Sequence, residues 1–416
     1  MNRRGFLSRY SAAEFIIRGM LAVAVGAIGF VSATHSLAFA AGTKNTELAL
    51  RLAPHDAQAL AVEAQNLSIG QVTAGDRKHS DELARKALRA DPTVVKAVTA
   101  LGMNAKARGD GARARRLFEY ADTLSRREIV THMWAIEESA RRGDISGAVM
   151  HYDMALRTSG RAPEVMFPPL AAAIANDEIR SSLVSILVRR PPWGSDFLDF
   201  AVANGPDTRA TARLLQGLAR RGYAVSEELS SLTVNRLIAA GFVADAWKFY
   251  ATYRPRADRT RSRDSRFTES ISTPSLFDWT PTDEAGVTAA VQRNAKGGAF
   301  EFVASSSVGG PLLQQTLRLP PGLYQLTGHS SEISQSADSR PFWVLKCASG
   351  TELGRVDMPN SADAKGLFSR QLRVPPGCPV QALILVAQPA QTMGGVGGRI
   401  DWVRLEPAGE KAAAGS

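Results

Sequence analysis

The chain has 416 residues, 44% of them hydrophobic, and a formal net charge of +10. This length allows two or three domains, and the apolar content excludes a wholly disordered chain because it suffices for a buried core. The positive charge comes mostly from scattered arginines. Since the sequence contains no nucleic-acid-binding motif, an anionic glycan or a lipid headgroup is as good a partner, and we predict no nucleic-acid partner.

The N-terminus predicts export. Residues 19–43 contain no Asp, Glu, Lys or Arg and are long enough to span a bilayer as a helix. A basic flank precedes them: Arg3, Arg4, Arg9 and Arg18. Such a flank stays in the cytoplasm, so we expect a single-pass inner-membrane protein whose bulk is periplasmic. The alternative is a cleaved secretory signal, because Ala38-Phe39-Ala40 has the small-x-small pattern.

One pattern then recurs three times. The pairs Gly75-Asp76, Gly109-Asp110 and Gly143-Asp144 are 34 residues apart. The same spacing separates Ala87, Ala121 and Ala155. This period resembles that of tetratricopeptide (TPR) repeats, whose helix pairs stack because none buries its apolar face alone. We expect each Gly to take a positive φ at the turn and the following Asp to cap the second helix.

The first helices of such repeats line a groove that binds a protein partner. By the register of the repeat, the groove residues are Lys96, Thr99, Met103, Lys106, Met133, Glu137 and Arg141. A polysaccharide hydrolase or lyase stays open as an alternative, with Glu137 and Asp153 as weak catalytic candidates, because two carboxylates suffice for glycoside chemistry. No nucleophile elbow, phosphate loop or zinc spacing occurs in the sequence, so we expect a binding protein with no cofactor and no metal.

The register weakens after Arg157, where prolines are expected to interrupt the helices, and a helical pattern returns over residues 207–253. An Arg-rich stretch follows, which is either a solvated linker or a patch for an acidic partner. The predicted domains are a cytoplasmic tip with a transmembrane anchor or signal (1–43), a TPR-like α-solenoid (44–253), the Arg-rich linker (254–266), an antiparallel β-sandwich (267–407) and a flexible tail (408–416).

The C-terminal third alternates as strands do, with turns rich in Gly and Pro. Seven strands are predicted: 299–304, 312–319, 322–329, 342–349, 367–374, 380–387 and 399–405. Their spacing is typical of a sandwich. The two cysteines, Cys347 and Cys378, lie on or beside strands, and in an exported protein they predict a disulfide rather than two buried thiols.

Three short segments of this region, FDW (277–279), LPPGLY (319–324) and GRIDWV (398–403), resemble the galactose-binding-like jelly roll of many carbohydrate-binding modules. The resemblance implies a glycan site with an exposed aromatic platform and polar neighbours. The candidates are Trp279, Gln314, His329, Trp343, Asp401 and Trp402. The alternative for each Trp is a place in the core of the sandwich.

The whole layout, with the segments LSRR (124–127), HYDMALRTS (151–159) and RPPW (190–193), is similar to membrane-anchored TPR proteins of exopolysaccharide loci in alphaproteobacteria. That resemblance implies a periplasmic scaffold that binds protein subunits of a polysaccharide synthesis or export machine. A glycan-binding protein that acts through its β-sandwich is the alternative.

Overall fold

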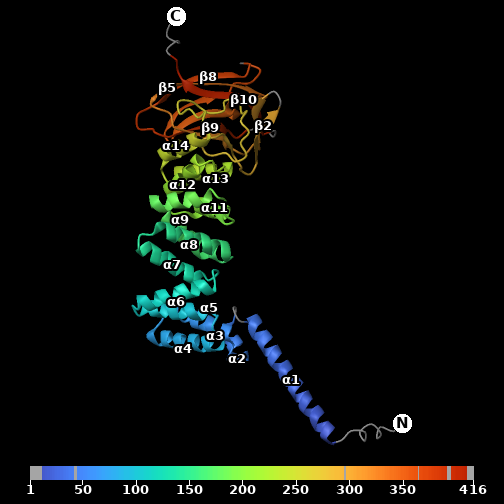
Figure 1. The fold of residues 1–416 in the computed structure, drawn as a ribbon. Helices are drawn as coiled ribbons and strands as arrows, with labels where there is room; N and C mark the ends of the chain where they lie inside the picture. The colour runs from blue at the N-terminus through green and yellow to red at the C-terminus, as the bar shows by residue number, and fades with distance from the viewer. Residues whose placement is uncertain (1–11, 42–44, 295–296, 364, 391–394, 410–416) are drawn as a thin grey trace, which may run out of the picture. The chain divides into compact units, whose positions relative to one another are not determined.

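The computed structural model describes residues 12–41, 45–294, 297–363, 365–390 and 395–409. The helices come first and the antiparallel strands last, as predicted (Figure 1). The chain divides into two compact units, one within Met1–Met166 with Pro191–Trp193, the other within Phe167–Arg190 and Gly194–Ser416. The basic residues Arg3, Arg4 and Arg9, and the predicted tail from residue 410, lie outside the described residues.

The first described helix is α1 (Ala12–Ala41). Its segment Ala13–Ala38 is long and apolar enough to cross a membrane, and among the residues that the structure describes it is the one helix that meets this test. A signal sequence near an N-terminus meets the same test by length and composition. The helix is therefore compatible with a membrane anchor or with a signal sequence.

The repeat region follows as paired helices. They are α2 (Thr46–Leu52), α3 (Ala57–Asn66), α4 (Ala74–Ala90), α5 (Val95–Ala107), α6 (Gly111–Leu124), α7 (Ile129–Arg141) and α8 (Ile145–Thr158). Gly109 and Gly143 have φ values of 81° and 73°, and both stand at turns between paired helices. The side chains of Asp110 and Asp144 accept hydrogen bonds from backbone N–H groups three residues on, at 3.0 and 2.8 Å. The turn chemistry expected of these two repeats is confirmed.

The first repeat turns differently. Helix α4 begins at Ala74, before Gly75, so the prediction that Gly75 forms the turn and Asp76 caps the helix is wrong. Thr73 is the N-cap: its hydroxyl accepts from the Asp76 N–H at 3.1 Å, while the Asp76 carboxylate accepts from the Thr73 N–H at 2.8 Å. This reciprocal capping box starts the helix one turn early, after a connection longer than those of the next two repeats.

Small residues let the paired helices approach closely. A Cβ at Gly102 on α5 would lie 3.0 Å from the ring of Phe118 on α6. Phe118 is fully buried and stacks on Trp134 of α7, with ring centroids 4.7 Å apart. The alanines of the ladder, Ala87 and Ala121, are also fully buried. The 34-residue spacing therefore marks the positions at which one helix packs against the next.

The next helix is α9 (Ala162–Ala173), and it contains Pro168 and Pro169. The prediction that prolines interrupt the helices after Arg157 is wrong for these two, whereas Pro191 and Pro192 lie between helices, as expected. Both are exposed, as are Glu164 and Val165, whose carbonyls would otherwise accept from the missing N–H groups. Solvent can hydrate those carbonyls, which explains how the helix tolerates the two rings.

The second unit holds further helices and then the sandwich. The helices are α10 (Asp177–Leu187), α11 (Gly194–Asn204), α12 (Thr208–Arg220), α13 (Glu227–Ala239) and α14 (Val243–Tyr253). Gly241 has a φ of 81° at the turn between α13 and α14. The returning helical pattern over residues 207–253 is thus confirmed.

Ten strands make two antiparallel five-stranded sheets within the described residues, ordered β1-β4-β9-β6-β7 and β2-β3-β10-β5-β8. Their bounds are β1 (Thr280–Pro281), β2 (Val287–Asn294), β3 (Gly297–Ala304), β4 (Gly310–Leu317), β5 (Gly322–Ser331), β6 (Phe342–Cys347), β7 (Glu352–Asp357), β8 (Leu367–Val374), β9 (Gln381–Ala387) and β10 (Val396–Pro407). All seven predicted strands are present. The three missed strands, β1, β2 and β7, are sheet edges, where fewer side chains enter the core and the alternation is weaker.

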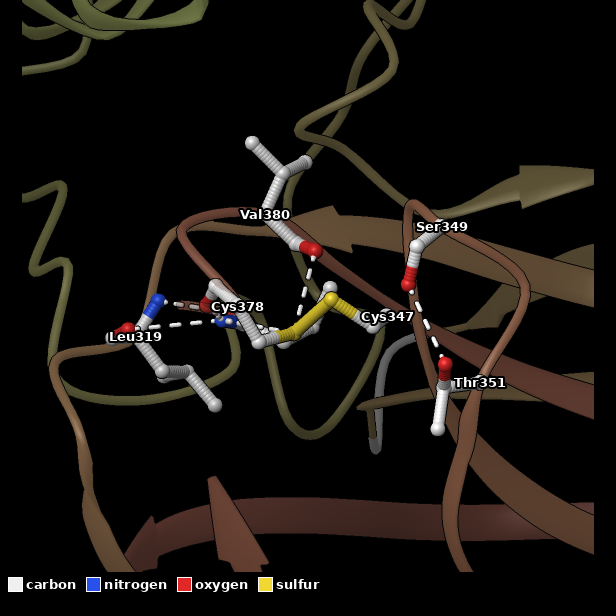
Figure 2. Close-up of a disulfide and its surroundings, with 7 residues drawn as sticks. Leu319, Cys347, Ser349, Thr351, Cys378 and Val380 are labelled. Carbon is white, nitrogen blue, oxygen red and sulfur yellow. Dashed lines mark hydrogen bonds between the residues drawn. A yellow bond between two sulfur atoms is a disulfide. The ribbon is translucent and has the colours of Figure 1, made fainter. Parts of the chain in front are cut away.

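A disulfide cross-links the chain at one end of this sandwich. Cys347 at the end of β6 bonds to Cys378 in the turn before β9, as predicted (Figure 2). Near the disulfide, the Leu319 N–H donates to the buried Gln381 side chain at 2.8 Å. Both cysteines are buried, so the cross-link belongs to the core.

The Arg-rich stretch, residues 254–266, is an ordered segment that we call the arginine strap. The N–H of Ser262 donates to the carbonyl of Leu405 on β10 at 2.8 Å, and the Ser262 hydroxyl accepts from the Leu405 N–H at 2.9 Å. The Val403 N–H donates to the Ser265 carbonyl at 2.9 Å, and the Arg263 N–H to the buried Gln315 side chain at 3.0 Å. Residues 262–265 of the strap thus lie along β10, while several earlier residues of the strap, among them Arg256 and Arg259, are exposed.

Candidate functional site

Five polar and aromatic side chains meet where β10 is irregular. The pairing of β10 with β5 shifts register between Ile400 and Trp402, which leaves Asp401 without a cross-strand partner in a β-bulge. His329 on β5 donates from Nδ1 to Asp401 Oδ2 at 2.8 Å, and the Ser331 hydroxyl donates to the same oxygen at 3.0 Å. We call His329, Ser331, Arg399, Asp401 and Trp402 the β10 site.

Two charged groups dominate the β10 site. Arg399 donates from Nε to Asp401 Oδ1 at 2.8 Å and from Nη1 to Glu301 on β3 at 2.7 Å. Burial by itself raises the pKa of the Asp401 carboxyl, but the hydrogen bonds from Arg399, His329 and Ser331 outweigh it and lower that pKa. Asp401 is therefore a carboxylate at neutral pH.

A hollow of about 370 Å³ opens at this site. Its lining residues are Arg266, Thr268, Gly297, Gly298, Arg399, Asp401 and Trp402. A Cβ at Gly298 would lie 2.0 Å from the backbone carbonyl of Phe267, so only glycine allows the chain after the strap to pass this close to β3. Half-buried Trp402 contributes an aromatic wall beside the carboxylate and the guanidinium.

The structure separates the six predicted glycan-site residues. His329, Asp401 and Trp402 come together in the β10 site, whereas Gln314 is exposed on β4 of the other sheet. Trp343 is fully buried and Trp279 is 7% exposed, with their rings 5.7 Å apart. Neither ring can present a face to a sugar, so for these two residues the prediction of a platform is wrong and the core alternative holds.

Sequence reasoning missed Ser331, Arg399 and Arg266. Residues two apart on a strand lie on the same face, so Arg399 could have been predicted as a neighbour of Asp401. The same alternation would send Trp402 to the opposite face, and only the bulge brings Asp401 and Trp402 to one hollow. The sequence does not indicate that Arg266 lies at the hollow of the β10 site, because its position depends on the path of the strap.

The predicted groove residues on the helices differ in burial and in their contacts. Thr99 is fully buried, accepts from the Gln65 amide at 3.0 Å and donates to the Lys96 carbonyl, so its prediction as a groove residue is wrong. Gln65 also donates to Glu128 at 3.0 Å, which links α3, α5 and the start of α7. Thr99 is therefore part of a buried hydrogen-bond network, centred on Gln65, that joins three helices.

Two of the other predicted groove residues form an ion pair with each other, and the apolar residue Met133 is exposed. Lys106 on α5 pairs with Glu137 on α7, and both side chains are largely exposed. Arg141 pairs with Glu138 rather than with Glu137. Met133 on α7 is 46% exposed, while Lys96 and Met103 are half-buried. Their part in partner binding stays a prediction.

The two weak catalytic candidates have structural neighbours. Asp153 accepts from Arg157 Nε at 2.8 Å and from the indole N–H of Trp193 at 2.9 Å. Glu137 makes the ion pair with Lys106. Within the described residues, no group of three or more His, Cys, Asp or Glu side chains is placed to hold a metal ion.

No protein-family profile matches the chain, and no curated protein sequence matches it. Among solved structures, it is similar to PilF of Pseudomonas aeruginosa at 16% identity, over 56% of this chain and 95% of that chain, with a TM-score of 0.27. It is similar to the C-terminal CBM6 module of the laminarinase LamC of Zobellia galactanivorans at 16% identity, over 29% of this chain and 90% of that one, with a TM-score of 0.19.

A third similarity is to the enzymatically active domain of tailspike protein 4 of bacteriophage CBA120, at 14% identity and a TM-score of 0.23, over 35% of this chain. The match spans 21% of that tailspike chain. At these scores the likenesses carry no argument about function, so the functional conclusion has to rest on the site.

Proposed function

We propose that this chain is an exported protein that binds envelope polysaccharide through the β10 site. The observation that carries the proposal is that Trp402, Asp401 and Arg399 line one open hollow, with Asp401 held by a hydrogen bond from His329. A sugar ring offers an apolar C–H face to an aromatic wall and hydroxyl groups to a carboxylate and a guanidinium. The β10 site supplies all three kinds of contact within one cavity.

Export is part of the proposal and has its own support. An apolar helix stands at the N-terminus, and the sandwich contains a disulfide, a bond that persists in oxidising compartments. We infer an inner-membrane anchor with the remainder in the periplasm. Alkaline phosphatase fused after Pro407 should be active in cells, and an inactive fusion of normal abundance would overturn this location.

The test of glycan binding uses the full-length protein in detergent micelles on a glycan array, followed by calorimetry with each hit. We expect Trp402→Ala and Asp401→Asn each to weaken binding at least tenfold, or about 1.4 kcal/mol. The matched control is Gln314→Ala, an exposed polar residue on the other sheet. An empty array, or binding that survives Trp402→Ala and fails with Gln314→Ala, would refute the site.

A second function is favoured by the helical face that carries Met133. The Gln65 amide ties α3, α5 and the start of α7 together, and Met133 on α7 exposes an apolar side chain. We propose that it docks a protein subunit of a polysaccharide synthesis or export machine. The two functions are compatible, since the unit with Met133 would bind a protein subunit and the unit with the β10 site would bind the polysaccharide.

A further inference from the structure

The arginine strap contains six arginines, and three of them fasten it. Arg254 pairs with Glu227 of α13, and Arg261 pairs with Asp258 at 2.9 Å. Arg263 reaches the fully buried Asp278 side chain at 3.1 Å and also pairs with Glu269. Arg254 and Arg263 thus tie the strap to residues outside it, while Arg261 pairs within the strap.

The other three, Arg256, Arg259 and Arg266, are exposed. Within the part of the chain that the structure describes, none of them makes an ion pair or a side-chain hydrogen bond. Their backbone is nevertheless part of the ordered strap, which is tied to β10 through Ser262 and Ser265. A guanidinium without an ion-pair partner can take a carboxylate or a sulfate in bidentate fashion.

A second hollow, of about 470 Å³, lies along the strap. Arg256 and Arg266 both line it, and Arg266 and Thr268 also line the 370 Å³ hollow of the β10 site. The two hollows therefore adjoin at Arg266. A polymer bound in the β10 site would therefore come close to Arg266, which also borders the hollow that Arg256 lines.

The acidic residues of the second hollow are already engaged. Asp258 pairs with Arg261, and Glu269 pairs with Arg263. Asp264 accepts from the backbone N–H groups of Thr268 and Glu269 at 2.8 and 3.1 Å. Glu406 lies 3.7 Å from Arg404. Among the described residues that line this hollow, Arg256 and Arg266 are thus the guanidinium groups without an ion-pair partner, while Asp264, whose donors are neutral, keeps its negative charge.

We propose that the ligand of the β10 site is an anionic polysaccharide whose acidic groups bind Arg256 and Arg266. This inference rests on the proposed glycan-binding function and adds the chemical class of the glycan. The aromatic wall and Asp401 would take one sugar ring, and the next acidic sugars along the polymer would lie over the strap. An acidic glycan is favoured over a lipid surface because the cationic path begins at an aromatic hollow.

The test compares two probes that differ only in charge: polygalacturonate and its fully methyl-esterified form. Binding of full-length protein in detergent is measured by calorimetry at low and high salt. We expect tighter binding of the charged form, and at least a tenfold loss when Arg256→Gln and Arg266→Gln are combined. The control combines Arg113→Gln with Arg220→Gln, which removes the same charge from two exposed helical positions and should change nothing.

The outcomes separate the two proposals. Equal binding of both probes, lost with Trp402→Ala but not with the strap variant, keeps glycan binding and overturns the anionic class. No binding of either probe, with no anionic hit on the glycan array, overturns the class as well. Vesicles of phosphatidylglycerol or duplex DNA that bind as tightly, with the same loss in the strap variant, would replace the glycan by another polyanion.

Discussion

The hydroxyl of Tyr250 on α14 donates a hydrogen bond to the Asp278 carboxylate, just before β1, at 2.6 Å. Asp278 is fully buried and also accepts from Arg263 at 3.1 Å and from the Ser275 N–H at 3.0 Å. Burial, followed by the charge of Asp278, raises the pKa of the Tyr250 hydroxyl far above its usual value. The end of the helical region and the sandwich therefore share a buried polar joint.

Replacing Tyr250 by Phe should loosen this joint. The change deletes one donor to a buried carboxylate and leaves the ring in place, so we expect the free energy of unfolding to fall by about 1–3 kcal/mol. Urea denaturation followed by tryptophan fluorescence measures it. The control is Tyr120→Phe, whose ring is 47% exposed on α6 and should shift stability by less than about 0.5 kcal/mol. Equal effects of the two changes would contradict the joint.

The Cys347–Cys378 bond closes a loop with a sequence separation of 31 residues. In the chain-entropy treatment, such a bond stabilises the folded state by about 3–4 kcal/mol. The double change Cys347→Ser with Cys378→Ser should therefore lower the melting temperature of the sandwich by roughly 10 °C. Calorimetry with and without reductant checks this, since reductant should lower the wild-type value and leave that of the double variant unchanged.

The proposed protein contact at Met133 predicts a site-specific cross-link. A photo-reactive amino acid placed at position 133 in the native host should give one adduct with an envelope subunit. The same residue placed at position 120, which is as exposed but lies on α6, should not. The proposal fails if both positions give the same adducts, or if position 133 gives none while the protein is properly localised.

Much of the fold was predictable because its signals are periodic. The repeat shows in sequence because Gly109, Gly143 and the buried alanines recur where helices turn and touch. The turn of the first repeat was predicted at the wrong place because Thr73 and Asp76 form a capping box that starts the helix before Gly75. The regular spacing of the Gly-Asp pairs gives no indication of this box. Three edge strands, β1, β2 and β7, were not predicted because they have too few buried positions to set a period, whereas the edge strand β8, with three buried positions, was predicted.

The site was less predictable because it depends on tertiary detail. Trp343 and Trp402 are equally aromatic in sequence, and only the packing of two sheets buries the first and leaves the second at a hollow. Asp401 owes its place to a β-bulge, and Arg266 to the course of the strap along β10. Alternation of side chains along a strand contains neither piece of information.

Glu138 on α7 gives the last prediction, which concerns pH. Its carboxylate accepts from Arg141 at 2.9 and 3.0 Å and from Arg115 of α6 at 2.9 Å. The hydrogen bonds from Arg141, opposed by burial and assisted by Arg115, lower the pKa of Glu138 from 4.5 to about 2. Because the folded-state pKa is the lower one, this stabilisation is complete above pH 4.5 and disappears as the pH falls towards 2.

We therefore expect Glu138→Gln to lower the melting temperature at pH 7 by about 2–4 °C, a shift that corresponds to about 1 kcal/mol for partly exposed ion pairs. The difference from wild type should shrink steadily below pH 4.5. Scanning calorimetry at pH 7, 4 and 3 follows it, with Glu119→Gln, an exposed residue of α6, as the control. A difference that grew on acidification would mean that Glu138 is protonated in the folded protein, and the assigned ion pairs would be wrong.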